Sequence, residues 1–373
     1  MKFRGPALVL VAITALALNP FSAEAQPCYS GFKYRVPVEL DNSSSDALSN
    51  YEVNLSLNTN ALIQTGKMQS LGQDIRFLDA SGNNLDYWIE SGINTSKTSL
   101  WVQVSSIRAY GKDTIYMYYG NSTATAKSNA DATFHLVDEF NGSTLNSSRW
   151  SACGSGTISL SRGSLNLTSN SSTASIETKQ SFSQPVLVEL TGVSSSGGGN
   201  AVMGQLNSSG SGYGMLHNGS VMQLASVSNS SCISATSFGS SNSTALVGNW
   251  SFVWTSGKQE GSWSGQTLNG AASTTTRGSS TTFVLGNTGS YGTLKVDYLR
   301  VRGYAATVPS VSLGSEQNMD FTLSASYESP LCVGGDLKLS ATAVAGGVYS
   351  WTGPNSFSSN LQNPVITGVS ASD

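Results

Sequence analysis

Apolar residues alternate with polar ones along most of this chain, and this period of two is the feature that most limits its fold. Between Tyr34 and Leu40 the apolar side chains take every second position, and Ile115, Met117 and Tyr119 repeat the pattern. Successive side chains of a strand point to opposite faces, so such runs predict strands with one buried face. Turn residues separate the runs. The sequence therefore predicts an all-β protein built of antiparallel β-sandwiches.

Breaks in this pattern divide the chain into four parts. We expect a signal peptide at 1–25, a β-sandwich at 26–133, a larger β body at 134–316 and a partial sandwich at 317–373. The signal peptide is predicted because Lys2 and Arg4 precede an apolar run at 7–18 and a small-x-small cleavage site at 23–25. No other apolar run approaches the length of a membrane span. The mature chain is thus predicted to be extracellular or displayed at the cell surface.

The charge of the chain is low, which limits its partners. Charged residues make up 11% of the sequence and the net charge is −3. Ser, Thr and Asn together account for roughly a third of it, far above their usual share. Without a basic stripe the chain is not expected to bind nucleic acid or an anionic membrane surface. The expected partners are a glycan, a cell-wall polymer or other surface proteins.

Four cysteines are present, at 28, 153, 232 and 332. None stands in a C-x-x-C pair and only two histidines accompany them, so a zinc site is not expected. Cys153 and Cys232 fall within one predicted body of an exported chain, and a disulfide between them is predicted. Two buried thiols are the alternative. The partners of Cys28 and Cys332 are not defined by the sequence.

The first body carries five motifs in a fixed order, which are Tyr34-Arg35-x-Pro37-Val38, the run 72–77, Tyr87-Trp88-Ile89-Glu90, the run 100–104 and the run 115–121. Together they resemble a domain of unknown function found in large bacterial and archaeal surface proteins. That resemblance implies a location and an architecture, since no activity is established for the family.

The second body opens with Asp138-Glu139-Phe140-Asn141-Gly142 and closes with the run 294–302. These ends resemble the first and last strands of concanavalin A-like (LamG-like) lectin and glucanase jelly rolls, which implies a jelly-roll fold. The third body, with Cys332 and Trp351, resembles an immunoglobulin-like module of bacterial surface proteins. It stops before the last strands of such a module, so we expect the sequence to be a fragment of a longer protein.

Catalysis is not expected from the acids of the second body. Glycoside hydrolysis needs two carboxyl groups flanking the scissile bond. Enzymes of the resembled fold carry them in a Glu-x-Asp-x-x-Glu run, which is missing here. The adjacent acids Asp138 and Glu139 would point to opposite faces of a strand. His135 and His217 stand alone, and no serine-nucleophile or phosphate-loop motif occurs.

Binding needs less machinery, because sugars stack on aromatic rings while amides and carboxylates meet their hydroxyl groups. The ligand-binding candidates are Trp263, Trp254, Tyr213 and Tyr291, with Asn218 and Gln223 as polar partners. Burial of these rings in the core is the competing interpretation.

No cofactor is expected beyond a structural calcium ion, for which Asp138 and Asp297 are the candidate ligands. Hydrogen bonds to neighbouring amides or ion pairs with Lys295 and Arg300 are the alternative role for these two acids. The preferred hypothesis is therefore a non-catalytic, glycan-binding or adhesive surface protein. A structural stalk without a small ligand is the first alternative, and a fragment of a glycoside hydrolase is the second.

Overall fold

The computed structural model describes residues 29–369 apart from 184, 219, 230–231, 244–246, 256–257, 264–265, 272–279, 320–324, 328–333, 344–348 and 354. The predicted signal peptide, Cys28 and Cys332 lie outside the described residues. Among the described residues, helix is confined to α1 (Thr59–Gln64) and α2 (Ala130–Thr133), and the other elements are strands. The prediction of an all-β protein is confirmed. Neither helix is long and apolar enough to cross a bilayer, in the part of the chain that the structure describes.

The first sandwich packs two antiparallel sheets against each other. One sheet has the order β25-β1-β7-β3-β4, with β26 also paired to β1, and the other has the order β2-β6-β5. The strands are β1 (Tyr34–Asn42), β2 (Leu48–Leu57), β3 (Arg76–Leu78), β4 (Asn84–Leu85), β5 (Tyr87–Ser91), β6 (Thr98–Ile107), β7 (Gly111–Tyr119), β25 (Ser310–Leu313) and β26 (Gln317–Asn318). Alternate residues of these strands, such as Val36, Val38 and Leu40, fill the core between the sheets.

The jelly roll is inserted into this first sandwich. The chain leaves the sandwich after β7, builds the jelly roll, and returns to pair β25 and β26 with β1. In the register of these pairs, Asp41 lies opposite Ser310 and Tyr34 opposite Asn318. Residues 310–313, within the range predicted for the second body, thus form a strand of the first sheet.

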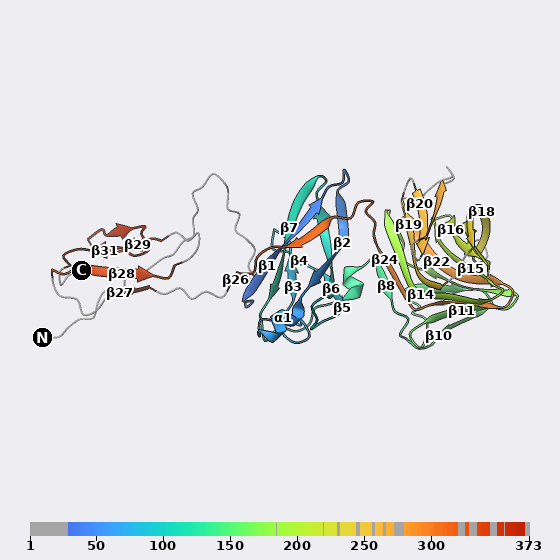
Figure 1. The fold of residues 1–373 in the computed structure, drawn as a ribbon, viewed down its shortest axis with the longest axis horizontal. Coiled ribbons are helices and arrows are strands. Elements are labelled where there is room, and N and C mark those ends of the chain that lie inside the picture. The colour runs from blue at the N-terminus through green and yellow to red at the C-terminus, as the bar shows by residue number, and fades with distance from the viewer. Residues whose placement is uncertain are drawn as a thin grey trace.

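Two large antiparallel sheets form the jelly roll (Figure 1). The first jelly-roll sheet has the order β10-β11-β23-β14-β19-β20-β21, and β24 pairs with both β14 and β8. Its strands are β8 (Leu136–Asp138), β10 (Thr157–Leu160), β11 (Leu165–Ser169), β14 (Val186–Gly197), β19 (Val247–Trp254), β20 (Lys258–Trp263), β21 (Gln266–Ala271), β23 (Gly292–Val296) and β24 (Tyr298–Gly303).

The second jelly-roll sheet has the order β18-β17-β16-β15-β22-β12-β9, with β13 paired to β22. Its strands are β9 (Trp150–Cys153), β12 (Ser172–Thr178), β13 (Phe182–Ser183), β15 (Asn200–Leu206), β16 (Ser211–His217), β17 (Val221–Ser228), β18 (Ser234–Ser243) and β22 (Ser280–Gly289). Side chains from the inner faces of both sheets form one core, which includes Trp150, Val188, Met203, Phe252 and Phe283.

Charged and aromatic side chains join the first sandwich to the jelly roll at a junction that we define by Glu52, Glu90, Trp101, Glu189, Arg300 and Arg302. The guanidinium of Arg300, which is 8% exposed, donates to Glu90 at 2.9 Å and to Glu189 at 2.8 Å. It also lies 4.4 Å from the ring centre of Trp101. Because Glu90 and Trp101 belong to the first sandwich, these contacts fix one body against the other.

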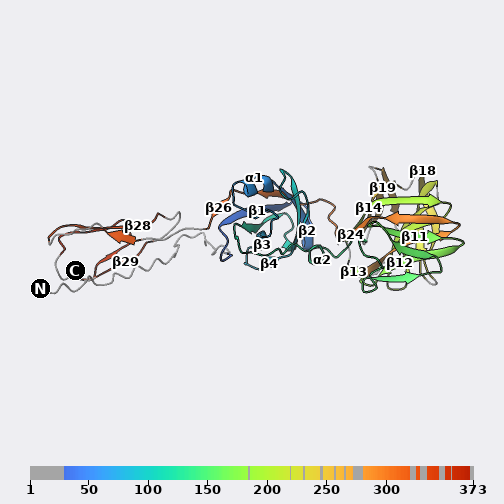
Figure 2. The same ribbon diagram turned by 90° about the horizontal axis from the view of Figure 1, so that it is seen from below.

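The third part consists of β27 (Ala325–Tyr327), β28 (Leu337–Ala341), β29 (Trp351–Thr352), β30 (Ser358–Ser359) and β31 (Val365–Ile366). Trp351 is buried against Leu339 and Ala341 in a small cluster. Its resemblance to an immunoglobulin-like module stays a prediction. Both views place these strands and the jelly roll on opposite sides of the first sandwich (Figures 1 and 2).

Candidate functional site

A row of polar side chains crosses the inner face of the second jelly-roll sheet, and we call it the polar row. Strand pairing sets Gln205 opposite Tyr213, Tyr213 opposite Ser226, and Ser226 opposite Thr236. Directly opposed residues of antiparallel strands project from the same face. That face is the inner one, because Met203 and Met215, two positions from Gln205 and Tyr213, belong to the core between the sheets.

The polar row leaves a pocket of about 430 Å³ between the two sheets. Elsewhere on this face Met215, Met222 and Leu224 fill the space between the sheets. Serine and threonine are too small to do so at positions 226 and 236, and the gap stays open. The indole of Trp254, on β19 of the first jelly-roll sheet, forms the opposite wall.

Two polar groups beside this pocket lack partners. Both amide atoms of Gln205, a fully buried residue, accept and donate no hydrogen bond within the described residues, and the same holds for Nε1 of Trp254. A buried polar group without a partner costs about 1–3 kcal/mol. These atoms are closed off from solvent and Gln205 does not line the pocket, so a ligand would reach them only after the side chains around them moved.

The structure brings together two of the four predicted aromatic ligands, Tyr213 and Trp254, and separates them from Tyr291. Tyr291 lies in the turn between β22 and β23 and is 66% exposed. Trp263 sits on β20 with its backbone opposite Trp250, and its side chain lies outside the described residues.

The predicted polar partners Asn218 and Gln223 do not line this pocket. The side chain of Asn218 accepts hydrogen bonds from the backbone of Ser220 and Val221 in the turn after β16. Gln223 is a half-buried residue of β17.

Asp138 and Asp297, the predicted calcium ligands, use their oxygens within the chain. Asp138 accepts from Nε1 of Trp150 at 2.7 Å and from the backbone of Phe140 at 2.9 Å. Asp297 accepts from Ser164 and Lys295, each at 2.6 Å. Burial opposes its charged form, but these two partners hold the pKa of Asp297 below its usual value. The described residues include no group of three or more Asp, Glu, His or Cys that fits a metal ion. Calcium at this place stays a prediction.

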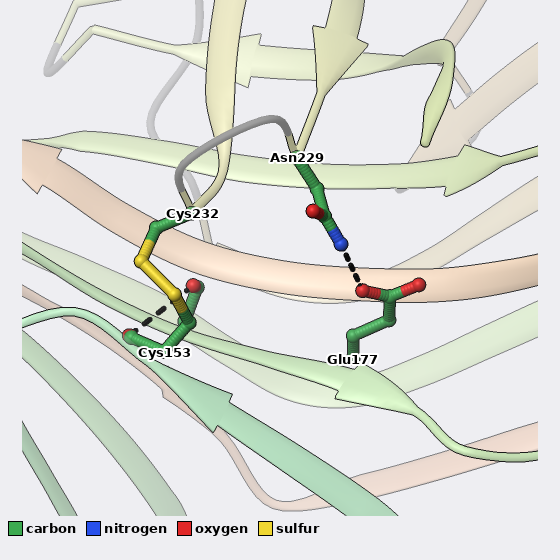
Figure 3. Close-up of a disulfide and its surroundings, with 5 residues drawn as sticks. Cys153, Glu177, Asn229 and Cys232 are labelled. Carbon is green, nitrogen blue, oxygen red and sulfur yellow. Dashed lines mark hydrogen bonds between the residues drawn. A yellow bond between two sulfur atoms is a disulfide. The ribbon is translucent and has the colours of Figure 1, made fainter. Parts of the chain in front are cut away.

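The outer face of the second jelly-roll sheet carries a short segment tied down by a disulfide. Cys232 is bonded to Cys153 of β9, the pair that the sequence predicts (Figure 3). The next residue, Ile233, packs on Val202 and Val284. A Cβ atom at position 286 would lie 2.6 Å from Ile233, so only glycine at this position of β22 admits the isoleucine.

Glu177 lies near this disulfide (Figure 3). Its carboxylate accepts from Oγ1 of Thr282 at 2.6 Å. It also accepts from the side chain of Asn229, as Figure 3 shows. The neighbouring Ile176 points into the core, so Glu177 projects from the outer face of its sheet. Glu189, whose neighbours Val188 and Leu190 are core residues, projects from the outer face of the other sheet. The thickness of the sandwich therefore separates these two acids.

Gln205, which lies opposite the pocket residue Tyr213, is a buried polar residue that the sequence interpretation missed. It follows Ala201 and Met203 at the next inward position of one strand. A glutamine in an otherwise apolar alternation is the signal that marks it, because a buried amide needs partners.

Comparisons with known proteins found one family model and several solved structures that are similar to parts of this chain. Residues 71–153 match DUF2341, a domain of unknown function, and this match runs from just before β3 to the end of β9. No curated protein matches the chain.

Several solved structures resemble the jelly roll at low identity. An endo-β-1,3-glucanase from Pyrococcus furiosus is 15% identical, with 47% of this chain and 95% of the other covered and a TM-score of 0.35. β-Agarase A from Zobellia galactanivorans is 13% identical, with 46% and 91% covered and a TM-score of 0.37. A lichenase from a mouse hindgut metagenome is 12% identical, with 46% and 100% covered and a TM-score of 0.35.

These comparisons correct one prediction. The chain was expected not to be an enzyme, and the structures named above are all glycan-degrading enzymes, which contradicts that expectation. The physical ground for it was the missing Glu-x-Asp-x-x-Glu run, and a missing motif does not exclude carboxylates placed by the fold. Identities and TM-scores of this size transfer no activity to this chain.

Proposed function

We propose that the jelly roll recognises a neutral glycan in the pocket between the polar row and Trp254. The convergence of Tyr213 and Trp254, from opposite sheets, on a pocket lined by neutral hydroxyl and amide side chains carries this proposal. An aromatic ring offers a flat apolar surface to the C–H face of a sugar, and hydroxyl and amide groups bond its hydroxyls.

The chemistry of the lining supports an uncharged ligand. The residues around the pocket are Asn207, Ser209, Ser211, Gly212, Tyr213, Ser226, Val227, Ser228, Ser234, Thr236 and Trp254. None of these described residues is charged, so the pocket offers no ion pair to a phosphate, a sulfate or a uronic acid. A hydroxyl-rich neutral sugar fits this set.

Glycan binding by residues 26–373 and by a Tyr213→Ala variant tests the proposal. We expect the substitution to weaken binding of a neutral oligosaccharide at this pocket by about fivefold, since an aromatic stacking contact contributes about 1 kcal/mol and each 1.4 kcal/mol is a factor of ten. Isothermal titration against oligosaccharides selected from an array measures the change.

The matched control is Tyr291→Ala, which removes an exposed ring of the same size far from the pocket. It is expected to leave binding unchanged. Equal affinities of the Tyr213→Ala protein and the unaltered chain would overturn the proposed site. Failure of the whole panel to bind would favour the structural stalk instead.

Cleavage of a glycan is the second candidate function, and Glu177 is the observation that favours it. This half-buried carboxylate is oriented by Thr282 and Asn229 on the outer face of the second jelly-roll sheet. A positioned carboxyl group can act as an acid or a base toward a glycosidic oxygen. Analysis of the incubated polysaccharides for new reducing ends, with Glu177→Gln for comparison, tests this function.

The place of action that we propose is outside the cell, at its surface. The predicted signal peptide, the low charge of the chain and the Cys153–Cys232 disulfide support it. Fractionation of the producing cells, with detection of the processed chain, tests this location.

A further inference from the structure

A second cavity of about 950 Å³ opens where the first sandwich meets the jelly roll, and we call it the junction cleft. One wall is the segment 44–51 at the start of β2, in the first sandwich. The other wall consists of the jelly-roll segments 180–183 and 303–306, with Pro185, Thr255 and His135. Neither body forms this cleft alone.

The two walls are held in a fixed relation at the base of the cleft. Gly303, a wall residue of the jelly roll, donates its backbone N–H to Glu52 of β2 at 2.9 Å. The adjacent residue Arg302 bonds Glu189 at 2.9 Å, and Arg300 spans the junction to Glu90. Because its walls are bonded to each other, the cleft is already formed before a ligand binds. Binding then does not have to pay the entropy cost of ordering the two walls.

His135 supplies an unused hydrogen-bonding group to this cleft. Burial lowers the pKa of its imidazole, which is therefore neutral at neutral pH. A neutral imidazole has one N–H donor and one acceptor nitrogen. No hydrogen bond to another of the described residues engages either nitrogen.

The remaining lining is rich in hydroxyl groups and contains no Lys or Arg among the described residues. Ser44, Ser49, Ser181 and Ser183 contribute hydroxyls, and the rings of Tyr51, Phe182 and Tyr304 contribute apolar faces. Asp46 is the sole charged residue among the described lining residues. This set lacks the Lys or Arg that a phosphate or a carboxylate ligand requires.

We propose that the junction cleft is a second glycan site, which binds a neutral oligosaccharide through Tyr304 and His135. This site uses none of the residues of the pocket beside the polar row, and its ligand contacts both bodies. The first sandwich thus takes part in recognition directly.

The number of oligosaccharides bound per chain tests this proposal. Native mass spectrometry of residues 26–373 with a panel of neutral hexasaccharides of glucose, mannose or galactose is expected to show two bound molecules. At a glycan concentration near the dissociation constants of the unaltered sites, we expect the doubly bound species to fall strongly both in a variant with His135→Ala and Tyr304→Ala and in a Tyr213→Ala variant, each of which then carries mostly one molecule. The three substitutions together are expected to bind none.

Tyr327→Ala, which removes an exposed ring on β27, is the matched control and should keep both bound molecules. Thermal unfolding of each variant shows whether it is folded. An unchanged stoichiometry after His135→Ala and Tyr304→Ala overturns the junction cleft as a site. If Tyr213→Ala still removes one bound molecule in that case, the proposed function stands. If instead His135→Ala with Tyr304→Ala removes one bound molecule and Tyr213→Ala removes none, the pocket beside the polar row is overturned and the junction cleft stands.

Discussion

At the scale of single residues, Gln205 is a buried amide without a hydrogen-bond partner in the part of the chain that the structure describes, and a ligand that bonded it would offset part of its desolvation cost. Gln205 is fully buried, and its amide has no partner among the described residues. The chain bears the desolvation cost of this group in the free state. A sugar hydroxyl that reached it from the pocket would regain part of that cost.

Replacement of Gln205 by leucine separates stability from binding. We expect Gln205→Leu to raise the free energy of unfolding by about 1–3 kcal/mol, because an unpaired buried amide is replaced by an apolar group of similar size. Glycan affinity should fall in the same variant. Urea unfolding monitored by tryptophan fluorescence measures the first change and titration measures the second.

Gln223→Leu is the control, since Gln223 is a half-buried glutamine of β17 that does not line the pocket. It should change stability by less than about 0.5 kcal/mol. A less stable Gln205→Leu protein would mean that the amide is bonded in solution, and the unpaired group would then not be available to a ligand.

The residue types that line the pocket could be predicted from the sequence, but the placement of Tyr213 and Trp254 on opposite walls of one pocket could not. Aromatic residues in a β-rich, weakly charged chain point to sugar contacts, which selects Tyr213 and Trp254 among others. Nothing in the sequence tells that a residue of β16 faces one of β19, since the spacing of two sheets depends on all the side chains between them. Tyr291 carries the same local signal and lies in an exposed turn.

At the scale of elements, the disulfide closes a long loop across the second jelly-roll sheet. Cys153 and Cys232 are separated by 79 positions, and Ile233 lies on the outer face next to the bond. Closing a loop of this length removes conformational entropy from the unfolded chain. The bond therefore stabilises the jelly roll as a whole and also holds Ile233 on the outer face of the sheet.

Removal of this bond has an expected cost. Cys153→Ser with Cys232→Ser should lower the free energy of unfolding of the jelly roll by about 4–5 kcal/mol in the chain-entropy estimate. Unfolding in urea with and without a reductant measures it. The reductant should destabilise the unaltered chain by a similar amount and leave the double variant unaffected. A loss below about 1 kcal/mol would show that native packing alone holds Ile233 in place.

The strands of the first sandwich follow the sequence pattern closely, except for those that complete its sheet. The alternations at 34–40, 100–104 and 115–119 correspond to β1, β6 and β7. The pairing of β25 and β26 with β1 joins residues more than 250 positions apart, and short polar runs such as 310–313 give no register signal.

Pro37 illustrates the same limit. Proline lacks the N–H of a ladder, so its strand is expected at an edge or with a bulge. In the structure β1 has neighbours on both sides, but Pro37 lies opposite the break between β25 and β26. Its carbonyl accepts from Gly314 in that break at 2.8 Å.

At the scale of the whole molecule, the junction contains a carboxyl group poised to titrate near neutral pH. Burial raises the pKa of Glu52 to about 7 from an ordinary value of 4.5, although Gly303 and Arg302 favour its charged form. One of its oxygens, Oε1, has no hydrogen-bond partner among the described residues.

The sign of the resulting pH dependence follows from the raised pKa. The folded state binds the Glu52 proton more tightly than the unfolded state does, so stability is greatest below about pH 4.5 for this group and falls as the pH rises to about 7. The shift corresponds to about 3 kcal/mol. We expect Glu52→Gln to remove this loss, so that the variant exceeds the unaltered chain in stability at pH 8. Thermal unfolding from pH 4.5 to 8 measures it.

The difference in stability between the two proteins at each pH is the internal control, because the other titrating groups contribute equally to both. Identical pH profiles of Glu52→Gln and the unaltered chain would contradict the burial of a titrating carboxyl at the junction.

The return of the chain to β1 has a mechanical consequence. Tension applied before Tyr34 and after Asn318 acts on two strands that are paired side by side in one sheet. The load passes from β1 to β26 and β25 without entering the jelly roll, which is attached between β7 and β25. A stretched chain would peel this pairing apart, one hydrogen bond after another, before any force reached the jelly roll. The jelly roll therefore lies outside the path of the load. It is expected to stay folded while the pairing of β1 with β25 and β26 carries the force.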